Sequence, residues 1–143
     1  MAKIDKWDQQ SRLPVAVCVD VDGTLAGLYQ SGRRELRSSA VVALELLSRH
    51  APVFLWSIAG AENGDRLIEE FPQLRPFVTG CYSKEGFPLH LVDNAFAIDD
   101  GEIDQAVLEC NHVVLDETYY GGEDSGSLLE AAKAVLAAMQ ARG

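Results

Sequence analysis

Two aspartates one residue apart, Asp20 and Asp22, follow a short apolar run over Val15–Val19. The run is continuously apolar rather than alternating, which predicts a strand buried on both faces. Side chains alternate along a strand, so the two carboxylates can face the same side. Open α/β sheets bind their ligands at the carboxyl ends of their strands. Carboxylates crowded at such an end need a cation to offset their repulsion, and all-oxygen ligation suits Mg²⁺.

The residues after Asp22 separate this motif from other patterns that contain paired aspartates. Gly23 permits a sharp turn, and an aspartate followed by glycine is by itself a routine turn signal. An EF-hand calcium loop also begins with two aspartates one residue apart, but it requires glycine at its sixth position and glutamate at its twelfth. Those positions hold Leu25 and Ser31, which excludes an EF-hand.

Polar side chains also end two later apolar runs. Ser57 closes the run Val53–Ser57, and Asp99 and Asp100 follow the run Asn94–Ile98. Taken alone, a serine after a strand is most often a turn residue, and an acid at the start of a helix complements the helix dipole. These ordinary interpretations stay open from the residue types alone.

With these residues in view, the segment Asp20–Leu25 resembles the first signature motif of the haloacid dehalogenase-like (HAD) superfamily. Members of that superfamily are mostly Mg²⁺-dependent phosphohydrolases built on a Rossmann-like sheet. Ser57, Lys84 and the pair Asp99 and Asp100 then match its second, third and fourth motifs in order. The resemblance spans Asp20 to Asp100 and therefore covers most of the expected fold.

Lys84 is the only lysine between Lys6 and Lys133, and it stands where the third motif places its lysine. Many relatives have proline after that lysine, whereas this chain has Glu85. Arg75 is the alternative cation if Lys84 does not fill the role.

The resemblance implies a two-step reaction at a metal site. Asp20 would attack phosphorus and form an aspartyl-phosphate, and Asp22 would act as general acid and then as general base. Mg²⁺ would be bound by Asp20, the carbonyl of Asp22, Asp99 and Asp100, with Asp100 acting through water or orienting Lys84.

The resemblance also implies which residues contact the phosphoryl group. Ser57 would donate its hydroxyl to a phosphoryl oxygen, and Lys84 would neutralise both the phosphoryl oxygens and the nucleophile. The implied substrate-binding residues are Gly23, Thr24, Ser57, Ile58 and Lys84.

The expected activity is phosphomonoester hydrolysis, with water as the default acceptor. Carbon–halogen hydrolysis is disfavoured because a dehalogenase does not need Asp22. Two alternatives stay open: a phosphotransferase that uses an alcohol as acceptor, and a non-catalytic interaction module that retains the fold.

Strands that alternate with helices must position these residues, which predicts a mostly parallel sheet. The resemblance implies a three-layer Rossmann-like fold with strand order 3-2-1-4-5, in which the first and fourth strands are neighbours. The expected strands are Val15–Val19, Val53–Ser57, Phe77–Cys81, Asn94–Ile98 and His112–Leu115.

Helices are expected between these strands and after the last one. Ser38 or Ser39 would cap the first helix, and a capping box formed by Ser127 and Glu130 would start the last. The expected helical ranges are 39–50, Ala61–Phe71, Glu102–Cys110 and a segment from Ser127 onward.

The chain of 143 residues suits a single domain, which we expect to span residues 1–143. Residues 1–13 form a polar extension without the apolar core of a signal peptide, and residues 25–37 read as a flap or hairpin beside the site. The flap is too short for a cap domain, and the other gap that could hold one, Ile58–Ser83, is already used by one helix and one strand, so we expect no cap domain. Arg33, Arg34 and Arg37 in the flap would be a solvated surface or would contact an anionic leaving group.

The formal net charge of −10 argues against a nucleic-acid groove, and no run reaches transmembrane length. Cys18, Cys81 and Cys110 are widely spread, as expected of small buried residues in a reducing cytoplasm. The expected partner is a phosphorylated substrate. Exposed Tyr119 and Tyr120 would favour self-association.

Overall fold

A five-stranded sheet organises the computed structural model, which describes residues 11–27, 34–100, 110–115 and 118–142. The strand order is β3-β2-β1-β4-β5, and every neighbouring pair is parallel. The predicted α/β class, Rossmann-like topology and strand order are therefore confirmed. None of the described helices is both long and apolar enough to cross a lipid bilayer.

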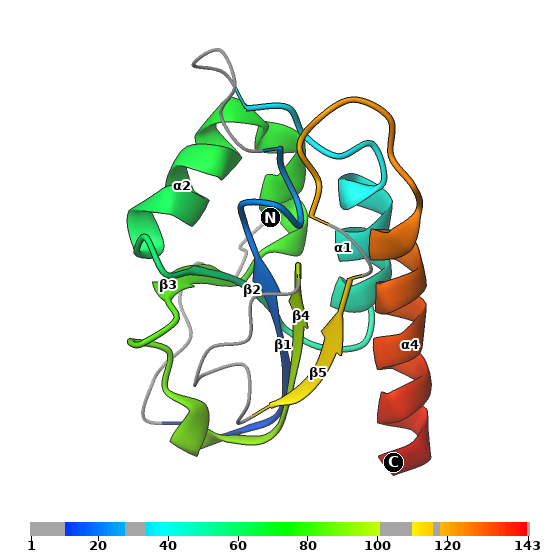
Figure 1. Ribbon diagram of the computed structural model, residues 1–143. Coiled ribbons are helices and arrows are strands. Elements are labelled where there is room, and N and C mark those ends of the chain that lie inside the picture. The colour runs from blue at the N-terminus through cyan, green and yellow to red at the C-terminus, as the bar shows by residue number, and fades with distance from the viewer. Residues whose placement is uncertain (1–10, 28–33, 101–109, 116–117, 143) are drawn as a thin grey trace.

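The central strand β1 (Leu13–Asp20) lies between β2 (Val53–Ser57) and β4 (Val92–Asp99) (Figure 1). In the parallel register Asp20 lies opposite Trp56 of β2, and the preceding residue of β1 lies opposite Ile98 of β4. Because parallel strands end at the same edge of a sheet, the carboxyl ends of β1, β2 and β4 meet.

The described helices α1 (Ala40–Ser48), α2 (Ala61–Glu70) and α4 (Ser127–Arg142) contribute to one large hydrophobic cluster. Figure 1 shows α1 and α4 side by side. The expected helix Glu102–Cys110 lies outside the described residues except for its last member.

Burial on both faces of β1 explains its continuously apolar sequence. Val17 and Val19 belong to the cluster that includes the helices, whereas Ala16 and Cys18 belong to a second cluster around Phe87. All four of these β1 side chains are fully buried. An alternating polar pattern would have placed polar groups in one of these two clusters.

The outer strands differ from the predicted ranges. The third strand, β3, runs over Gly80–Ser83 rather than Phe77–Cys81, because a 3₁₀ helix over Pro72–Phe77 takes up the beginning of the expected range. Two prolines in that segment favour a tight turn over an extended strand. The fifth strand, β5, runs over Asn111–Val114 and so begins one residue early.

Helix capping also departs from expectation. Ser39 precedes α1, but its hydroxyl makes no capping hydrogen bond, and its backbone N–H donates to Asp124 Oδ2 at 2.8 Å instead. Ser127 is the first residue of α4 rather than its cap, and the Glu130 N–H donates to the Gly126 carbonyl at 3.1 Å. Ser39 thus occupies the predicted N-cap position without the capping hydrogen bond, whereas the predicted capping role of Ser127 is wrong.

The described ends of the predicted flap pair with each other. The Gly27 N–H donates to the Glu35 carbonyl at 2.7 Å, and the Arg37 N–H donates to the Leu25 carbonyl at 2.8 Å. Ala26 and Leu36 form an antiparallel bridge between these ends. Residues 28–33 and most of the predicted polar extension lie outside the described residues.

Candidate active site

Three carboxylates meet where β1 and β4 end. Asp20 is the last residue of β1, Asp99 is the last residue of β4, and Asp100 follows directly. One oxygen from each lies within 4.8 Å of the others, and Asp20 and Asp99 are buried. Buried carboxylate oxygens at this spacing are the donor set that Mg²⁺ prefers, so the residues present fit that ion.

Lys84 supplies the positive charge nearest to this cluster. Its Nζ atom lies 2.7 Å from Asp99 Oδ2 and 3.3 Å from Asp20 Oδ1, and the side chain is buried. The alternative cation, Arg75, is exposed on the 3₁₀ helix. The structure thus brings Lys84 to the site, at the place where the resemblance expects a lysine.

The clustered carboxylates repel one another. Burial, together with the neighbouring charge of Asp99, raises the pKa of Asp20 to about 8, although Lys84 opposes the shift. Burial and a hydrogen bond with Asp100 raise the pKa of Asp99 to about 6, again against the effect of Lys84. A single ammonium group therefore does not balance the carboxylates, and a divalent cation would supply the missing charge.

The turn after β1 places backbone rather than side chain against Asp100. Gly23 has a φ of +84°, and a Cβ atom there would overlap the Asp100 carboxylate and approach Thr118 Cγ2 to 2.8 Å. The Gly23 carbonyl accepts a hydrogen bond from the Tyr119 N–H at 2.8 Å. Both the left-handed backbone and the close approach require glycine at this position.

Thr24 contacts the expected nucleophile. Its side chain is fully buried, and its hydroxyl donates to Asp20 Oδ2 at 3.3 Å. Lys84 contacts the other oxygen, Oδ1, so both oxygens of the Asp20 carboxylate have a partner. The substrate-binding role predicted for Thr24 stays a prediction, and the contact that the structure gives its hydroxyl is with Asp20.

Ser57 ends β2 beside the cluster and is buried. Its hydroxyl oxygen accepts hydrogen bonds from the Ala59 N–H and from Asn63 Nδ2, both at 3.0 Å. The backbone N–H of Lys84 donates to the Ser57 carbonyl at 3.1 Å, which joins the two motifs. Ile58 follows, and its side chain is 67% exposed.

Asp22 stands apart from the three clustered carboxylates. Its Oδ2 accepts a hydrogen bond from Asn63 Nδ2 at 2.8 Å, and its Oδ1 lies 3.4 Å from Arg34 Nη1. The side chain is one-third exposed, in contrast to the buried Asp20. Solvent therefore reaches the Asp22 carboxyl group, whereas Asp20 and Asp99 are buried.

Sequence reasoning missed Asn63 and misread two of the flap arginines. Arg34 is buried and donates from Nε to Glu70 Oε1 at 3.0 Å and from Nη1 to Asn63 Oδ1 at 2.8 Å. Arg37 is buried over the Tyr119 ring, 4.7 Å from its centroid. Neither arginine is solvated, so that interpretation of both is wrong, whereas Arg33 lies outside the described residues.

Tyr119 was expected to be exposed, but it is buried, and its hydroxyl donates to the Gly122 carbonyl at 3.0 Å. Tyr120 is 58% exposed, as expected. Self-association therefore stays a prediction that depends on Tyr120, and sedimentation at micromolar concentration would test it.

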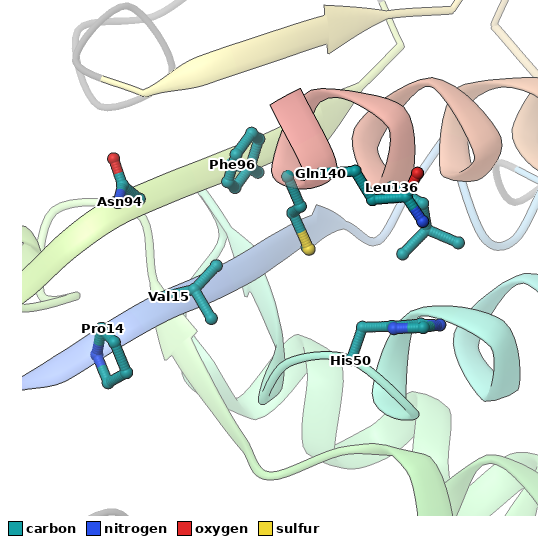
Figure 2. A pocket seen from close by; sticks show the side chains of 8 residues that line it. Pro14, Val15, His50, Asn94, Phe96, Leu136 and Gln140 are labelled. Atoms are coloured by element: carbon teal, nitrogen blue, oxygen red, sulfur yellow. The ribbon is translucent and has the colours of Figure 1, made fainter. Parts of the chain in front are cut away.

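A separate cavity of about 330 Å³ lies at the opposite end of the sheet (Figure 2). Val15 of β1 and Phe96 of β4 line it together with Leu136 and Met139 of α4. This apolar cavity lies toward the amino end of β1, and none of the clustered carboxylates lines it. This cavity and the carboxylate cluster thus lie at opposite ends of the sheet.

Comparisons with known proteins found no matching family model and no matching curated protein. Among solved structures, the chain is similar to a Legionella pneumophila protein provisionally assigned as a HAD superfamily (subfamily III A) hydrolase. The TM-score is 0.47 at 15% sequence identity, and the match covers 90% of this chain and 84% of the other. At this identity the likeness concerns the fold and not the chemistry.

Proposed function

We propose that this chain is a Mg²⁺-dependent phosphomonoester hydrolase that works through an aspartyl-phosphate on Asp20. The observation that carries the proposal is the contact of Lys84 Nζ with both Asp20 and Asp99, beside Asp100, at the carboxyl end of the sheet. Mg²⁺ held by Asp20, Asp99 and Asp100 would offset repulsion between an anionic nucleophile and an anionic phosphoryl group.

In the first step, a carboxylate oxygen of Asp20 forms a bond to phosphorus while the bond from phosphorus to the ester oxygen breaks. The leaving oxygen takes the proton of the Asp22 carboxyl group and departs as an alcohol. Thr24 and Lys84 orient the attacking carboxylate through their contacts with its two oxygens.

In the second step, a water oxygen forms a bond to phosphorus, and the bond from phosphorus to Asp20 breaks. The Asp22 carboxylate accepts the proton that the water loses. Inorganic phosphate leaves, Asp20 is again a carboxylate and Asp22 is again protonated. Ser57 and Lys84 donate to the phosphoryl oxygens in both steps.

The partial exposure of Asp22 favours water as the acceptor, because the proton-transferring group is itself open to solvent. We further propose that the chain forms one domain without a cap, with the paired ends of residues 25–37 beside the site. A substrate would then enter from the solvent side of Asp22.

A direct test measures phosphate release from p-nitrophenyl phosphate and a panel of phosphorylated metabolites, with millimolar Mg²⁺ or with EDTA. We expect turnover with Mg²⁺, its loss in EDTA, and a loss of several orders of magnitude in a folded Asp20→Asn variant. Addition of an alcohol, with product analysis, separates hydrolysis from phosphotransfer. A wild-type protein with no Mg²⁺-dependent turnover of any probe would contradict the proposal and favour a non-catalytic module.

A further inference from the structure

We propose that Asn63 is a positioning residue, fixed by Arg34, that aims the Ser57 hydroxyl at the substrate and holds Asp22 in place. The inference rests on the proposed function and adds two residues to its machinery. Asn63 lies near the start of α2 and is buried, and it contacts Ser57, Asp22 and Arg34 at the same time.

Arg34 determines which way the Asn63 amide points. A guanidinium group only donates hydrogen bonds, so the atom 2.8 Å from Arg34 Nη1 must be the amide oxygen Oδ1. A second donor of Arg34, Nη2, lies 3.4 Å from the Asn63 backbone carbonyl. The Nδ2 group is thereby turned toward the site, where its two hydrogens meet two acceptors.

The first acceptor is Ser57 Oγ, 3.0 Å from Asn63 Nδ2. The same oxygen accepts from the Ala59 N–H, so two donors occupy its acceptor sites. Among the described residues no acceptor takes the Ser57 hydrogen, which leaves it for a bound group. Ser57 therefore presents a donor, and a phosphoryl oxygen is the complementary acceptor.

The second acceptor is Asp22 Oδ2, 2.8 Å from Asn63 Nδ2. Arg34 is more distant from Asp22, at 3.4 Å, and its closer carboxylate partner is Glu70 at 2.9 Å. Glu70 thus lies closer to the guanidinium group than Asp22 does, and the neutral amide of Asn63 makes a shorter contact to Asp22 than Arg34 makes. One side chain consequently sets the orientation of both the phosphoryl-binding hydroxyl and the proposed general acid.

Asn63→Asp tests this arrangement because it keeps the shape and the acceptor for Arg34 but removes both donor hydrogens. Ser57 would then donate to residue 63 instead of the substrate, and Asp22 would face a second carboxylate. Asn94→Asp on β4, at the opposite end of the sheet, makes the same chemical change away from the site and serves as the matched control.

The readout compares an aryl phosphate with an alkyl phosphate, because p-nitrophenolate leaves without a proton whereas an alkoxide does not. For Asn63→Asp, kcat/KM for p-nitrophenyl phosphate should fall about 10- to 100-fold through loss of the Ser57 donor. The value for glycerol 2-phosphate should fall at least about tenfold further, since Asp22 is displaced. Asn94→Asp should change neither value by more than about twofold.

The results distinguish a failure of the role proposed for Asn63 from a failure of the proposed phosphatase function. An equal fall for both substrates, or no fall, would leave the phosphatase in place and overturn the role of Asn63. A wild-type protein inactive on both probes would overturn the proposed function and this inference with it. If Asn63→Asp does not fold, Asn63→Ala removes the same donor without adding charge, and the same change in substrate ratio is expected.

A double variant supplies a second measurement. If Asn63 acts on the phosphoryl group through Ser57, adding Asn63→Asp to Ser57→Ala should lower kcat/KM for p-nitrophenyl phosphate, which reports the first step alone, by less than about threefold. Independent effects would multiply instead, and that result would contradict the proposed path.

Discussion

The Nζ atom of Lys84 lies 2.7 Å from Asp99 Oδ2, and both side chains are buried. Fifteen residues separate the two along the chain, and Lys84 follows β3 whereas Asp99 ends β4. Their contact links the segment after an edge strand to the centre of the sheet.

Lys84→Met should destabilise the metal-free protein by about 3 kcal/mol at pH 8, because buried carboxylates lose their paired cation. The loss should be smaller at pH 5, where the carboxyl groups of Asp20 and Asp99 bind protons. Urea unfolding in EDTA at both pH values measures the effect. Lys133→Met on the surface of α4 is the control, since its exposed pair with Glu130 contributes less than about 1 kcal/mol. Equal losses at the two pH values would contradict this account.

Mg²⁺ should raise the melting temperature by several degrees, because a cation that binds only the folded state stabilises it by linkage. Asp99→Asn should abolish most of that rise. Asp93→Asn on the same strand changes an exposed carboxylate paired with Arg12 and should leave the rise intact. A melting temperature that does not respond to millimolar Mg²⁺ would argue against a metal site.

Without metal, stability should fall as the pH rises from about 4 to about 8. The folded-state pKa of Asp20, about 8, exceeds the ordinary value of 3.8, so the folded protein holds a proton that the unfolded chain has released. The slope from one such group approaches about 1.4 kcal/mol per pH unit. Asp20→Asn should flatten this dependence in EDTA. A free energy of unfolding that increases with pH over this range would contradict a raised pKa for Asp20 in the folded protein.

Asp22→Asn should trap a phosphorylated protein when p-nitrophenyl phosphate is the substrate. The aryl leaving group needs no proton, so the first step continues, whereas hydrolysis of the aspartyl-phosphate lacks its general base. Mass spectrometry of acid-quenched samples should show one added phosphoryl group on the peptide that contains Asp20. Its absence in a variant that still releases p-nitrophenol in a burst would contradict the proposed intermediate.

Gly23 and Gly122 provide a matched pair, because both have a φ of +84°. A Cβ atom at position 122 would have no neighbour within 4 Å. Gly122→Ala should therefore lower the free energy of unfolding by about 1 kcal/mol, from backbone strain alone. Alanine at Gly23 should cost at least about 2 kcal/mol more and should lower activity, since it displaces Asp100. Denaturant unfolding compares the two variants. Equal losses in the free energy of unfolding would mean that the overlap with Asp100 does not destabilise the Gly23 variant.

The central part of the fold could be predicted because β1, β2 and β4 are buried and therefore continuously apolar. Val53–Ser57 matches the predicted range, as its five residues are all buried. The edge strand β3 lacks that signal, because each of its four residues is only partly buried. Its prediction over Phe77–Cys81 consequently missed the 3₁₀ helix.

The clustered carboxylates and Lys84 were found because each follows a strand in a known order. Asn63 was missed and Arg34 was misread because their contact joins positions 29 residues apart without a local pattern. Within a polar segment, the sequence does not distinguish a buried arginine from a solvated one. The hydrogen bonds of Arg34 reach Asn63 and Glu70 of α2, which are distant from it in the sequence.

The two-sided burial of β1 also limits how homologous chains can vary in length. Deletion of one residue between Val15 and Asp20 would exchange the side chains that face the two hydrophobic clusters. It would also turn Asp20 away from Lys84 and Asp99. Evolution can therefore alter side-chain size within this strand far more readily than it can insert or delete residues, and length differences among relatives should accumulate elsewhere.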